Sequence, residues 1–456
     1  MSKKRSSRTT KKNKRVLEQI NHNAAGVDLG AQEVWVAVGE HVSSEPVQRF
    51  GTTTGELRRS AEWMRSCGVE TVAIEATGVY WVAAFEIYEE YGLNPVLVSS
   101  RSIRRFNGMK KSDYIDCQWI QLLHTFDILQ ASIRAEAKMI ELRTYMRQRR
   151  MLTEKASEHI QHMQKALVLM NVRLDQAVSD ITGVTGMKII RAILKGDRDA
   201  EELAKHRDPG CAKSEQQIAE ALTGHYRDEQ IFALDQAVRL WDVHRELIAE
   251  CDEKIEAMLQ TLPVKAERDT IPKARGKRGK PRKNEIQFDA RTLLYERLGV
   301  DLTQIVGLHV LTILTVLSEC GMDLNRFPTG KHFCSWLGLA PGTNITGGRV
   351  ISAKSRRTTN RAATALRLAA QALADSNTEL GAFYRRKKGQ IGPEKAINAT
   401  AAKLARRIYD SLRTGRVYAD RGEAFYDLMH QERSLIALQK RARRLNMKLV
   451  PITEAA

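Results

Sequence analysis

Four acidic residues stand where a fold can aim them at one point. Asp28 ends one short apolar run, and Glu75 directly follows another. Asp113 and Asp116 lie three residues apart at the start of a helical pattern, so on a helix they share one face. Carboxylates brought that close repel each other and require cations. The usual solution is a pair of divalent metal ions, which stabilises the attacking and leaving oxygens of a phosphoryl transfer.

Each acid taken alone is weak evidence for such a site. Acids in solvated loops are common, and Asp113 and Asp116 can simply be acids favoured by the dipole at a helix N-terminus. The combination is stronger, because two strand-end acids followed by a helical pair match an RNase H-like metal site. We therefore predict that Asp28, Glu75, Asp113 and Asp116 together bind Mg²⁺, as two ions, with Mn²⁺ as the alternative.

A competing interpretation starts from Gly26–Gly30, which also resembles the first phosphate loop of the actin and sugar-kinase ATPases. Those proteins need a second Asp-x-Gly phosphate loop and a Gly-rich adenosine motif. The sequence offers neither in a suitable strand context, so the ATPase is the weaker interpretation.

The composition favours a nucleic-acid partner. The 456 residues suffice for two or three domains of roughly 100–200 residues each. A net charge of +19 indicates a polyanionic partner, with nucleic acid as the leading candidate, although a merely soluble basic protein is the simpler alternative. The cysteines form no CxxC pair, no apolar stretch is long enough to span a membrane, and the N-terminus lacks the apolar region of a signal peptide. We expect reduced thiols, no membrane partner, and a cytoplasmic, nucleoid-associated protein.

The first half of the chain predicts an α/β domain followed by helices. After a basic arm at residues 1–22, residues 23–130 alternate strands with helices around an interior sheet. The predicted strands are Ala25–Leu29, Val34–Val38, Thr71–Ile74 and Asn94–Val98, and the helices are Leu57–Cys67 and Val79–Tyr91. Residues 131–264 carry long helical spacings that predict a coiled-coil arm, with a compact bundle as the alternative.

The second half begins with a basic linker at residues 265–285, rich in Gly and Pro. Residues 286–415 then predict a mostly helical domain, and residues 416–456 a helical tail. Within this domain, a Gly-rich loop at Asn344–Arg349 precedes two strong helical patterns, Thr359–Ala374 and Ala396–Leu412.

Several motifs in this order resemble a known family, the DEDD transposases of bacterial insertion sequences, in the insertion sequence 110 group. The motifs are Val27-Asp28-Leu29-Gly30, Ile74-Glu75-Ala76-Thr77-Gly78, Lys110-Lys111-Ser112-Asp113-Tyr114-Ile115-Asp116, and Trp336-Leu337-Gly338-Leu339-Ala340-Pro341 followed by Thr346-Gly347-Gly348. The resemblance covers roughly residues 24–180 and 300–412. It implies a RuvC-type, RNase H-like N-terminal domain, a coiled-coil dimerisation arm and a helical C-terminal transposase domain. It also implies site-specific DNA recombination by a dimer or tetramer, guided by a structured noncoding RNA.

Carried over to this chain, the resemblance makes Asp28, Glu75, Asp113 and Asp116 the DEDD acids. The family places a serine nucleophile just before the Gly of the loop, where this chain has Thr346. A threonine hydroxyl can act as a nucleophile but is more hindered. Ser352 and Ser355, shortly downstream, are the alternatives, and an inactive loop is the third.

Cations surround this loop and could hold a phosphate. The predicted nucleic-acid-binding residues are Arg349, Lys354, Arg356, Arg357, Arg361, Arg385 and Arg386, the last two in a stretch that interleaves aromatic and basic residues. Two function classes follow. The first is a DNA recombinase with both catalytic parts. The second is a nucleic-acid-binding protein or a decayed transposase, which the departure at Thr346 keeps open.

Overall fold

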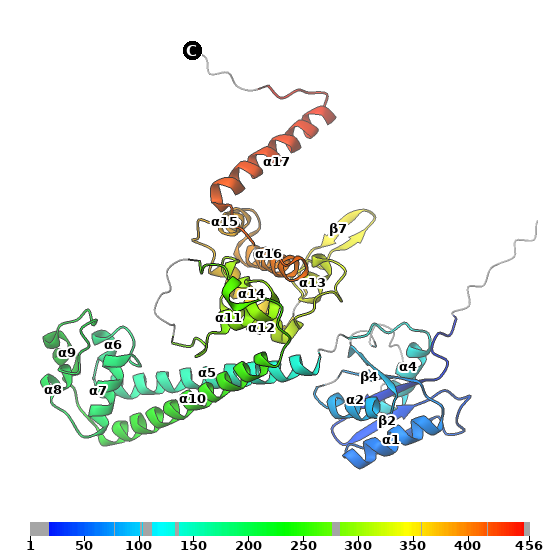
Figure 1. Cartoon of the computed structure of the whole chain (residues 1–456), viewed down its shortest axis with the longest axis horizontal. Helices are drawn as coiled ribbons and strands as arrows, with labels where there is room; N and C mark the ends of the chain where they lie inside the picture. The colour runs from blue at the N-terminus through cyan, green and yellow to red at the C-terminus, as the bar shows by residue number, and fades with distance from the viewer. Residues whose placement is uncertain are drawn as a thin grey trace, which may run out of the picture. The chain divides into compact units, whose positions relative to one another are not determined.

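The structure is a computed structural model of the chain, and it divides into two compact units, residues 1–134 and 135–456 (Figure 1). It describes residues 18–76, 78–100, 103, 112–132, 136–275, 283–356, 358–416 and 418–450. Most of the basic arm, part of the basic linker and Arg357 lie outside the described residues.

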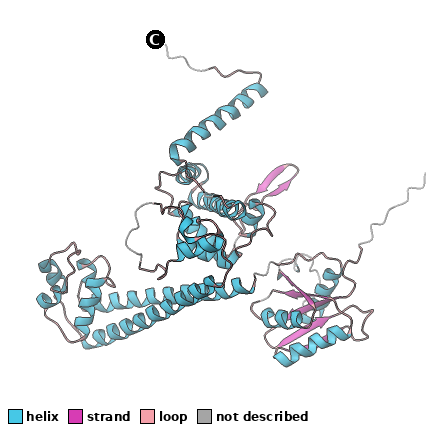
Figure 2. Cartoon of the chain, in the orientation of Figure 1, coloured by secondary structure: helices cyan, strands magenta, loops and turns pink. Residues whose placement is uncertain are grey.

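The first unit is built on one mixed five-stranded sheet. Its strands are β1 (Ala24–Leu29), β2 (Glu33–Ala37), β3 (Val47–Gly51), β4 (Thr71–Glu75) and β5 (Asn94–Val98) (Figure 2). Their order is β3-β2-β1-β4-β5. The pairs β1–β2 and β2–β3 are antiparallel, whereas β4 runs parallel to both β1 and β5. The central strand β1 therefore has a hairpin on one side and parallel strands on the other.

Helices cover both faces of this sheet. On one face, α1 (Thr54–Ser66) and α2 (Trp81–Glu90) bury their apolar residues against the inward side chains of the strands, such as Val34 and Val36. On the other face, α4 (Asp113–Thr125) packs through Ile120 and Leu123. The alternation of side chains along each strand thus produces two separate cores, one on each face.

Helix α4 lies in backbone contact with β1 at Gly26. A Cβ at this position would lie 2.7 Å from the Cα of Gln121, and nearer still to the Gln121 nitrogen and the Cys117 carbonyl oxygen. The position therefore requires glycine because a helix backbone occupies the space of its side chain. The approach is secured by Gln121, whose Nε2 donates to the Ala24 carbonyl at 3.3 Å.

The second unit begins with two long helices, α5 (Ala137–Leu169) and α10 (Asp228–Gln260), which lie side by side and run in opposite directions (Figure 1). Short helices close the distal end of the pair: α6 (Leu174–Ala177), α7 (Val184–Leu194), α8 (Ala200–Ala204) and α9 (Glu215–Leu222). A buried ion pair between Arg149 Nε and Asp252 Oδ1, 2.5 Å apart, joins the two long helices. Arg149 also donates to the carbonyls of Asn284 and Glu285, which ties the end of the linker to this pair.

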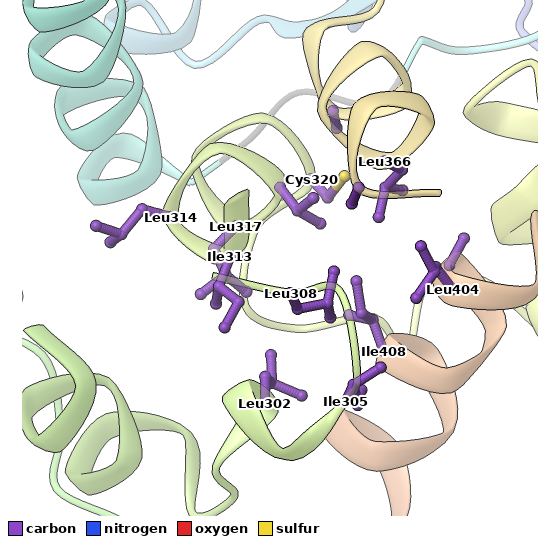
Figure 3. Close-up of a cluster of buried hydrophobic side chains, with 14 of the residues drawn as sticks. Leu302, Ile305, Leu308, Ile313, Leu314, Leu317, Cys320, Leu366, Leu404 and Ile408 are labelled. Atoms are coloured by element: carbon purple, nitrogen blue, oxygen red, sulfur yellow. The ribbon is translucent and has the colours of Figure 1, made fainter. Parts of the chain in front are cut away.

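The proximal end of the helical pair is part of the core of the C-terminal region. Met139 and Leu142 of α5 and Met258 of α10 belong to the same buried cluster as the C-terminal helices. Figure 3 shows a part of this cluster, in which Leu308, Leu317, Leu366 and Ile408 converge from different elements. The elements of the region are η1 (Arg268–Thr270), α11 (Ala290–Leu298), η2 (Leu302–Gln304), α12 (Val310–Cys320), α13 (Gly330–Trp336), β6 (Asn344–Thr346), β7 (Arg349–Ser352), α14 (Arg361–Gln371), α15 (Glu379–Ile391), α16 (Pro393–Thr414) and α17 (Gly422–Arg444).

The structure confirms the fold class at its coarse level: a mixed α/β sheet with helices first, and a mostly helical region after it. It differs from the sequence prediction in two ways. Strand β3 was not predicted, because its sequence Val-Gln-Arg-Phe-Gly lacks a clear apolar alternation. The predicted Gly-rich loop is a β-hairpin, β6–β7. In the described part of the chain, no helix is long and apolar enough to cross a membrane.

We predict that Gly26→Ala destabilises the first unit by about 2–3 kcal/mol, because the new Cβ must push α4 away from β1. Gly55→Ala is the matched control, since nothing lies within 4 Å of a Cβ there, and it should shift the stability by less than about 1 kcal/mol. Urea unfolding followed by tryptophan fluorescence measures both, because Trp35, Trp63, Trp81 and Trp119 all belong to this unit. Equal effects of the two substitutions would contradict the close packing.

Candidate functional site

The sheet places Asp28 and Glu75 on neighbouring strands at the same edge. Strands β1 and β4 are parallel, and Val27 is paired with Ile74, so the next residue of each strand is Asp28 and Glu75. Residues at one register in adjacent strands point to the same face, about 4.8 Å apart across the sheet. Asp28 also shares its face with Gly26, two residues earlier, which is the face that α4 covers.

Helix α4 brings the other two acids to this edge. Asp113 and Asp116 occupy its first turn, which begins after the N-cap Ser112, whose hydroxyl accepts from the nitrogen of Ile115 at 3.3 Å. The helix touches β1 at Gly26, which lies two residues before Asp28. The contact on the helix side begins at Cys117, one turn after Asp113. The first turn of α4 therefore lies over the end of β1.

The electrostatics show that the four acids share one neighbourhood. The pKa of Asp28 is raised from 3.8 to about 7, first by partial burial and then by the negative charges of Glu75, Asp113 and Asp116. A hydrogen bond from the backbone of Leu29 acts in the opposite direction. The four predicted metal ligands therefore act on one another through their charges.

The side-chain oxygens of these four described acids do not form a metal site, although the charges of the acids are coupled. Among the residues that the structure describes, no three His, Cys, Asp or Glu side chains form a group arranged to hold a metal ion. The side-chain oxygens are thus not set as ligands, although the charges reach Asp28. The strand register and the contact at Gly26 bring the backbones of the four acids to one edge of the sheet, and rotation of a side chain changes neither of them.

The second candidate site is the hairpin β6–β7, which carries Thr346 at the end of its first strand. Thr346 is paired directly with Arg349, and Gly347 and Gly348 form the turn with φ of 56° and 76°. Positive φ at both central residues is what a two-residue hairpin turn requires, and glycine adopts it without strain. The hydroxyl of Thr346 and the guanidinium of Arg349 therefore belong to one face of an exposed ribbon.

The alternative hydroxyls lie lower in the same ribbon. Ser352 is half-buried and its Oγ accepts from the nitrogen of Lys354 at 3.4 Å. Ser355 is also half-buried and is paired with Pro341 in an isolated bridge. Thr346 is the most exposed of the three.

Comparison with protein families agrees with both candidate sites. A transposase family model of the DEDD type in the IS110 group matches residues 25–172. A model described as the transposase IS116/IS110/IS902 family matches residues 301–385. The chain belongs to the IS110 family of transposases. No curated protein matches it. The family resemblance inferred from the motifs is thus confirmed, and a transposase acts on DNA.

The predicted nucleic-acid-binding residues of the transposase fall into two groups. Arg349, Lys354, Arg356 and Arg361 are exposed on the hairpin or shortly after it. Arg361 also lines a pocket of about 290 Å³ between α5, α12 and the start of α14. Arg356 donates to the carbonyl of Trp336 at 3.4 Å. All four side chains reach solvent, and their role in binding a phosphate backbone stays a prediction.

Arg385 and Arg386 have partners within the protein. Arg385 donates to the carbonyls of Ala374 and Ser376 at 2.9 Å and to Glu423 at 2.6 Å. Arg386 Nε donates to the hydroxyl of Tyr426 at 2.8 Å. Both arginines therefore join α15 to α17, whatever else they bind.

Two aromatic residues beside the acids were missed by the sequence analysis. Trp35 is paired with Asp28 across β1 and β2. The centroid of its ring lies 6.0 Å from that of Tyr114, the residue that follows Asp113 in the sequence of α4. The alternation of β2 already placed Trp35 on the face opposite to Val34 and Val36. The hairpin register was the missing information, since it alone sets Trp35 next to Asp28.

We predict that the pKa of Asp28 makes the metal-free transposase sensitive to pH. The folded protein holds this proton up to about pH 7, whereas the unfolded chain loses it near the ordinary value of 3.8, so ionisation costs stability as the pH rises between them. Asp28→Asn removes the cost. The melting temperature of the variant minus that of wild type should grow from pH 5 to about pH 7 and stay level above it.

Added Mg²⁺ supplies the control for this experiment. It should raise the melting temperature of wild type at pH 8 and have little effect on Asp28→Asn, because the substitution removes one of the four carboxylates. A difference that is constant from pH 5 to pH 8 would contradict the coupling.

Proposed function

We propose that this transposase cleaves and rejoins DNA strands by metal-dependent phosphoryl transfer, with Thr346 as the nucleophile. The observation that carries the proposal is the coupling of Asp28 to Glu75, Asp113 and Asp116, placed by three separate elements of the first unit. A fold that gathers four carboxylates against their mutual repulsion gains from cations at that point.

The sheet supports an RNase H-like domain as the finer description of the first unit. Three antiparallel strands are followed by two parallel ones in the order β3-β2-β1-β4-β5, with acids at the ends of β1 and β4 and in the helix packed on β1. In the same way, the antiparallel pair α5 and α10 supports the proposed coiled-coil arm (Figure 1).

The residues suit a divalent cation, because a set of carboxylate oxygens is what hard cations such as Mg²⁺ prefer. Asp28, Glu75, Asp113 and Asp116 would hold two Mg²⁺ ions, or Mn²⁺ in their place. Such ions, when bound, stabilise negative charge on the attacking and leaving oxygens of a phosphate.

Thr346 supplies the oxygen that attacks. Its Oγ1 forms a bond to phosphorus while the bond from phosphorus to one deoxyribose oxygen breaks, and that oxygen leaves with a proton as a hydroxyl. The hydroxyl of the exchanged strand later attacks the phospho-threonine and releases Thr346, which recovers its proton. Each step replaces one P–O bond by another, so strand exchange needs no external energy source. Arg349, across the hairpin from Thr346, is placed to neutralise charge on the phosphate.

Neither unit suffices alone under this proposal. The acids of the first unit provide no covalent carrier, and the hairpin of the second provides no metal ligands. We therefore propose that the hairpin of one subunit meets the acid cluster of its own or a partner subunit in a dimer or tetramer, where orientation lowers the barrier. A structured noncoding RNA that pairs with the DNA, and a nucleoid-associated location in the cytoplasm, complete the proposal.

The second candidate function is a nucleic-acid-binding protein or a decayed transposase without strand exchange. Thr346 in place of the expected serine favours it, as does the lack of a ready metal-ligand group among the described residues. Trapping a covalent protein–DNA adduct on a nicked suicide substrate decides between the two functions. Peptide mapping of the adduct then identifies the attached residue.

We predict that Thr346→Val abolishes adduct formation and strand exchange while DNA affinity is unchanged, since only the hydroxyl is lost. Thr346→Ser should keep or raise the rate, because it removes the methyl group that hinders attack. Ser352→Ala and Ser355→Ala are the matched controls in the same ribbon, and both should keep the adduct. An adduct that persists in Thr346→Val but is lost in either control would assign the nucleophile to that serine.

We also predict that nucleic-acid binding weakens steeply with salt, because the net charge is +19. Each phosphate neutralised should contribute roughly −0.9 to the slope of log K against log salt for duplex DNA. Deleting residues 1–15 should reduce the slope without changing sequence preference, since an arm that contacts phosphates positions more than it specifies. Affinities measured by fluorescence anisotropy from 50 to 200 mM salt test this, and a flat response would reject the electrostatic contribution.

A further inference from the structure

Beside the acid cluster, the first unit exposes a pair of aromatic rings that the proposed chemistry does not use. Trp35 stands directly opposite Asp28 across the β1–β2 pair, where the Cβ atoms of facing residues are about 4.5–5.5 Å apart. Tyr114 follows Asp113 in α4 and is 46% exposed. The two rings meet edge to face, with 6.0 Å between their centroids. Both rings thus border the point where the phosphate would lie.

The surroundings of Trp35 fix its ring and leave part of it open. Its Nε1 donates to Oε2 of Glu33 at 3.3 Å, which satisfies the polar atom of the indole. Glu33 also forms an ion pair of 3.0 Å with Arg49, the residue paired with Trp35 on β3. The guanidinium carbon of Arg49 lies 6.0 Å from the Trp35 ring centroid, and its side chain is 61% exposed. Glu33 therefore positions both an aromatic ring and a cation beside the acids.

We propose that Trp35 and Tyr114 form a stacking platform for an unpaired nucleobase of the DNA strand whose phosphate lies at the acid cluster. Successive nucleotides follow each other at about 3.4 Å along the axis of duplex DNA and lie further apart in an unpaired strand, so a ring adjacent to Asp28 reaches the base next to that phosphate. Aromatic rings next to a cation are the usual platform for single strands, because every base has a face to stack. Arg49 would contact the flanking phosphate.

This inference rests on the proposed function, because the acid cluster is what brings the phosphate beside the rings. The stacking platform adds a requirement to the proposed metal-dependent reaction. The base beside the reacting phosphate must leave the duplex stack, which costs a few kcal/mol that stacking on Trp35 offsets. The platform would thereby fix which phosphate of the strand faces the acids.

The test compares two labelled strands of equal length, oligodeoxythymidine and a strand of abasic sites, which carry the same phosphates but differ in their bases. Wild type should bind the thymidine strand more tightly. Trp35→Leu and Tyr114→Leu should each weaken thymidine binding about tenfold, as expected for a lost stacking contact, and should leave the abasic strand unchanged. Trp35→Phe keeps an aromatic ring and should stay close to wild type. Fluorescence anisotropy at fixed salt measures all of these affinities.

Trp63→Leu is the matched control, since Trp63 packs against Phe50 at 5.9 Å on the opposite face of the sheet. It should lower neither affinity. Melting temperatures show whether each variant folds, and the exposed Tyr114 keeps the test valid if Trp35→Leu does not. Equal affinity of folded Tyr114→Leu and wild type for thymidine would overturn the platform.

The binding assay needs no strand cleavage, so it separates the two proposals. Base-dependent binding in a protein that forms no adduct would leave the platform standing while the recombinase fails. An adduct on Thr346 together with unchanged thymidine binding in the variants would support the recombinase and contradict the stacking platform.

Discussion

The candidate site depends on one contact, the approach of the α4 backbone to β1 at Gly26. Glycine alone fits there, because the nitrogen of Gln121 and the carbonyl oxygen of Cys117 occupy the place of a side chain. The contact sets the depth and the position of the helix on the sheet, and with them the place of Asp113 and Asp116. A larger residue at position 26 would push α4, with Asp113 and Asp116, away from Asp28 and Glu75, although position 26 itself lies outside the acid cluster.

The same contact makes the site electrostatically costly. Four carboxylates near one point are unfavourable without cations, and their charges add to the burial that raises the pKa of Asp28. On the opposite face of the sheet, α1 and α2 cover the strands mainly with apolar residues such as Phe85, and the buried hydroxyl of Ser60 there is hydrogen-bonded to that of Tyr88 at 2.9 Å. Asp28 and the apolar cluster under α1 and α2 thus lie on opposite faces of the same sheet. Burial of the thiol of Cys117 raises its pKa to about 12, with the charge of Asp28 adding to the effect, so this neighbour stays protonated.

Much of this could be read from the sequence, because it depends on local patterns. Apolar runs predicted β1 and β4 with acids at their ends, and the spacing of Asp113 and Asp116 predicted a shared helix face. What the sequence could not supply was the pairing between distant segments. Nothing local sets the ring of Tyr114 against Trp35 or β4 beside β1, and nothing local predicts the short polar strand β3. Gly347 and Gly348 of the predicted Gly-rich loop form a hairpin turn, which depends on the pairing of β6 with β7.

The hairpin β6–β7 presents Thr346 on an exposed ribbon that is fixed mainly at its base. A lone two-stranded ribbon is marginally stable, and Ile345, Val350 and Ile351 are all more than half exposed. Its base is fixed by the bridge of Pro341 with Ser355 and by the bond from the Gly342 nitrogen to the Lys354 carbonyl at 3.0 Å, but its tip has only the turn. Under the proposed function, the exact position of Thr346 would then be set by what the ribbon meets. Order imposed by DNA and by the acid cluster would limit attack to phosphates already held in place, which is a useful property in a transposase.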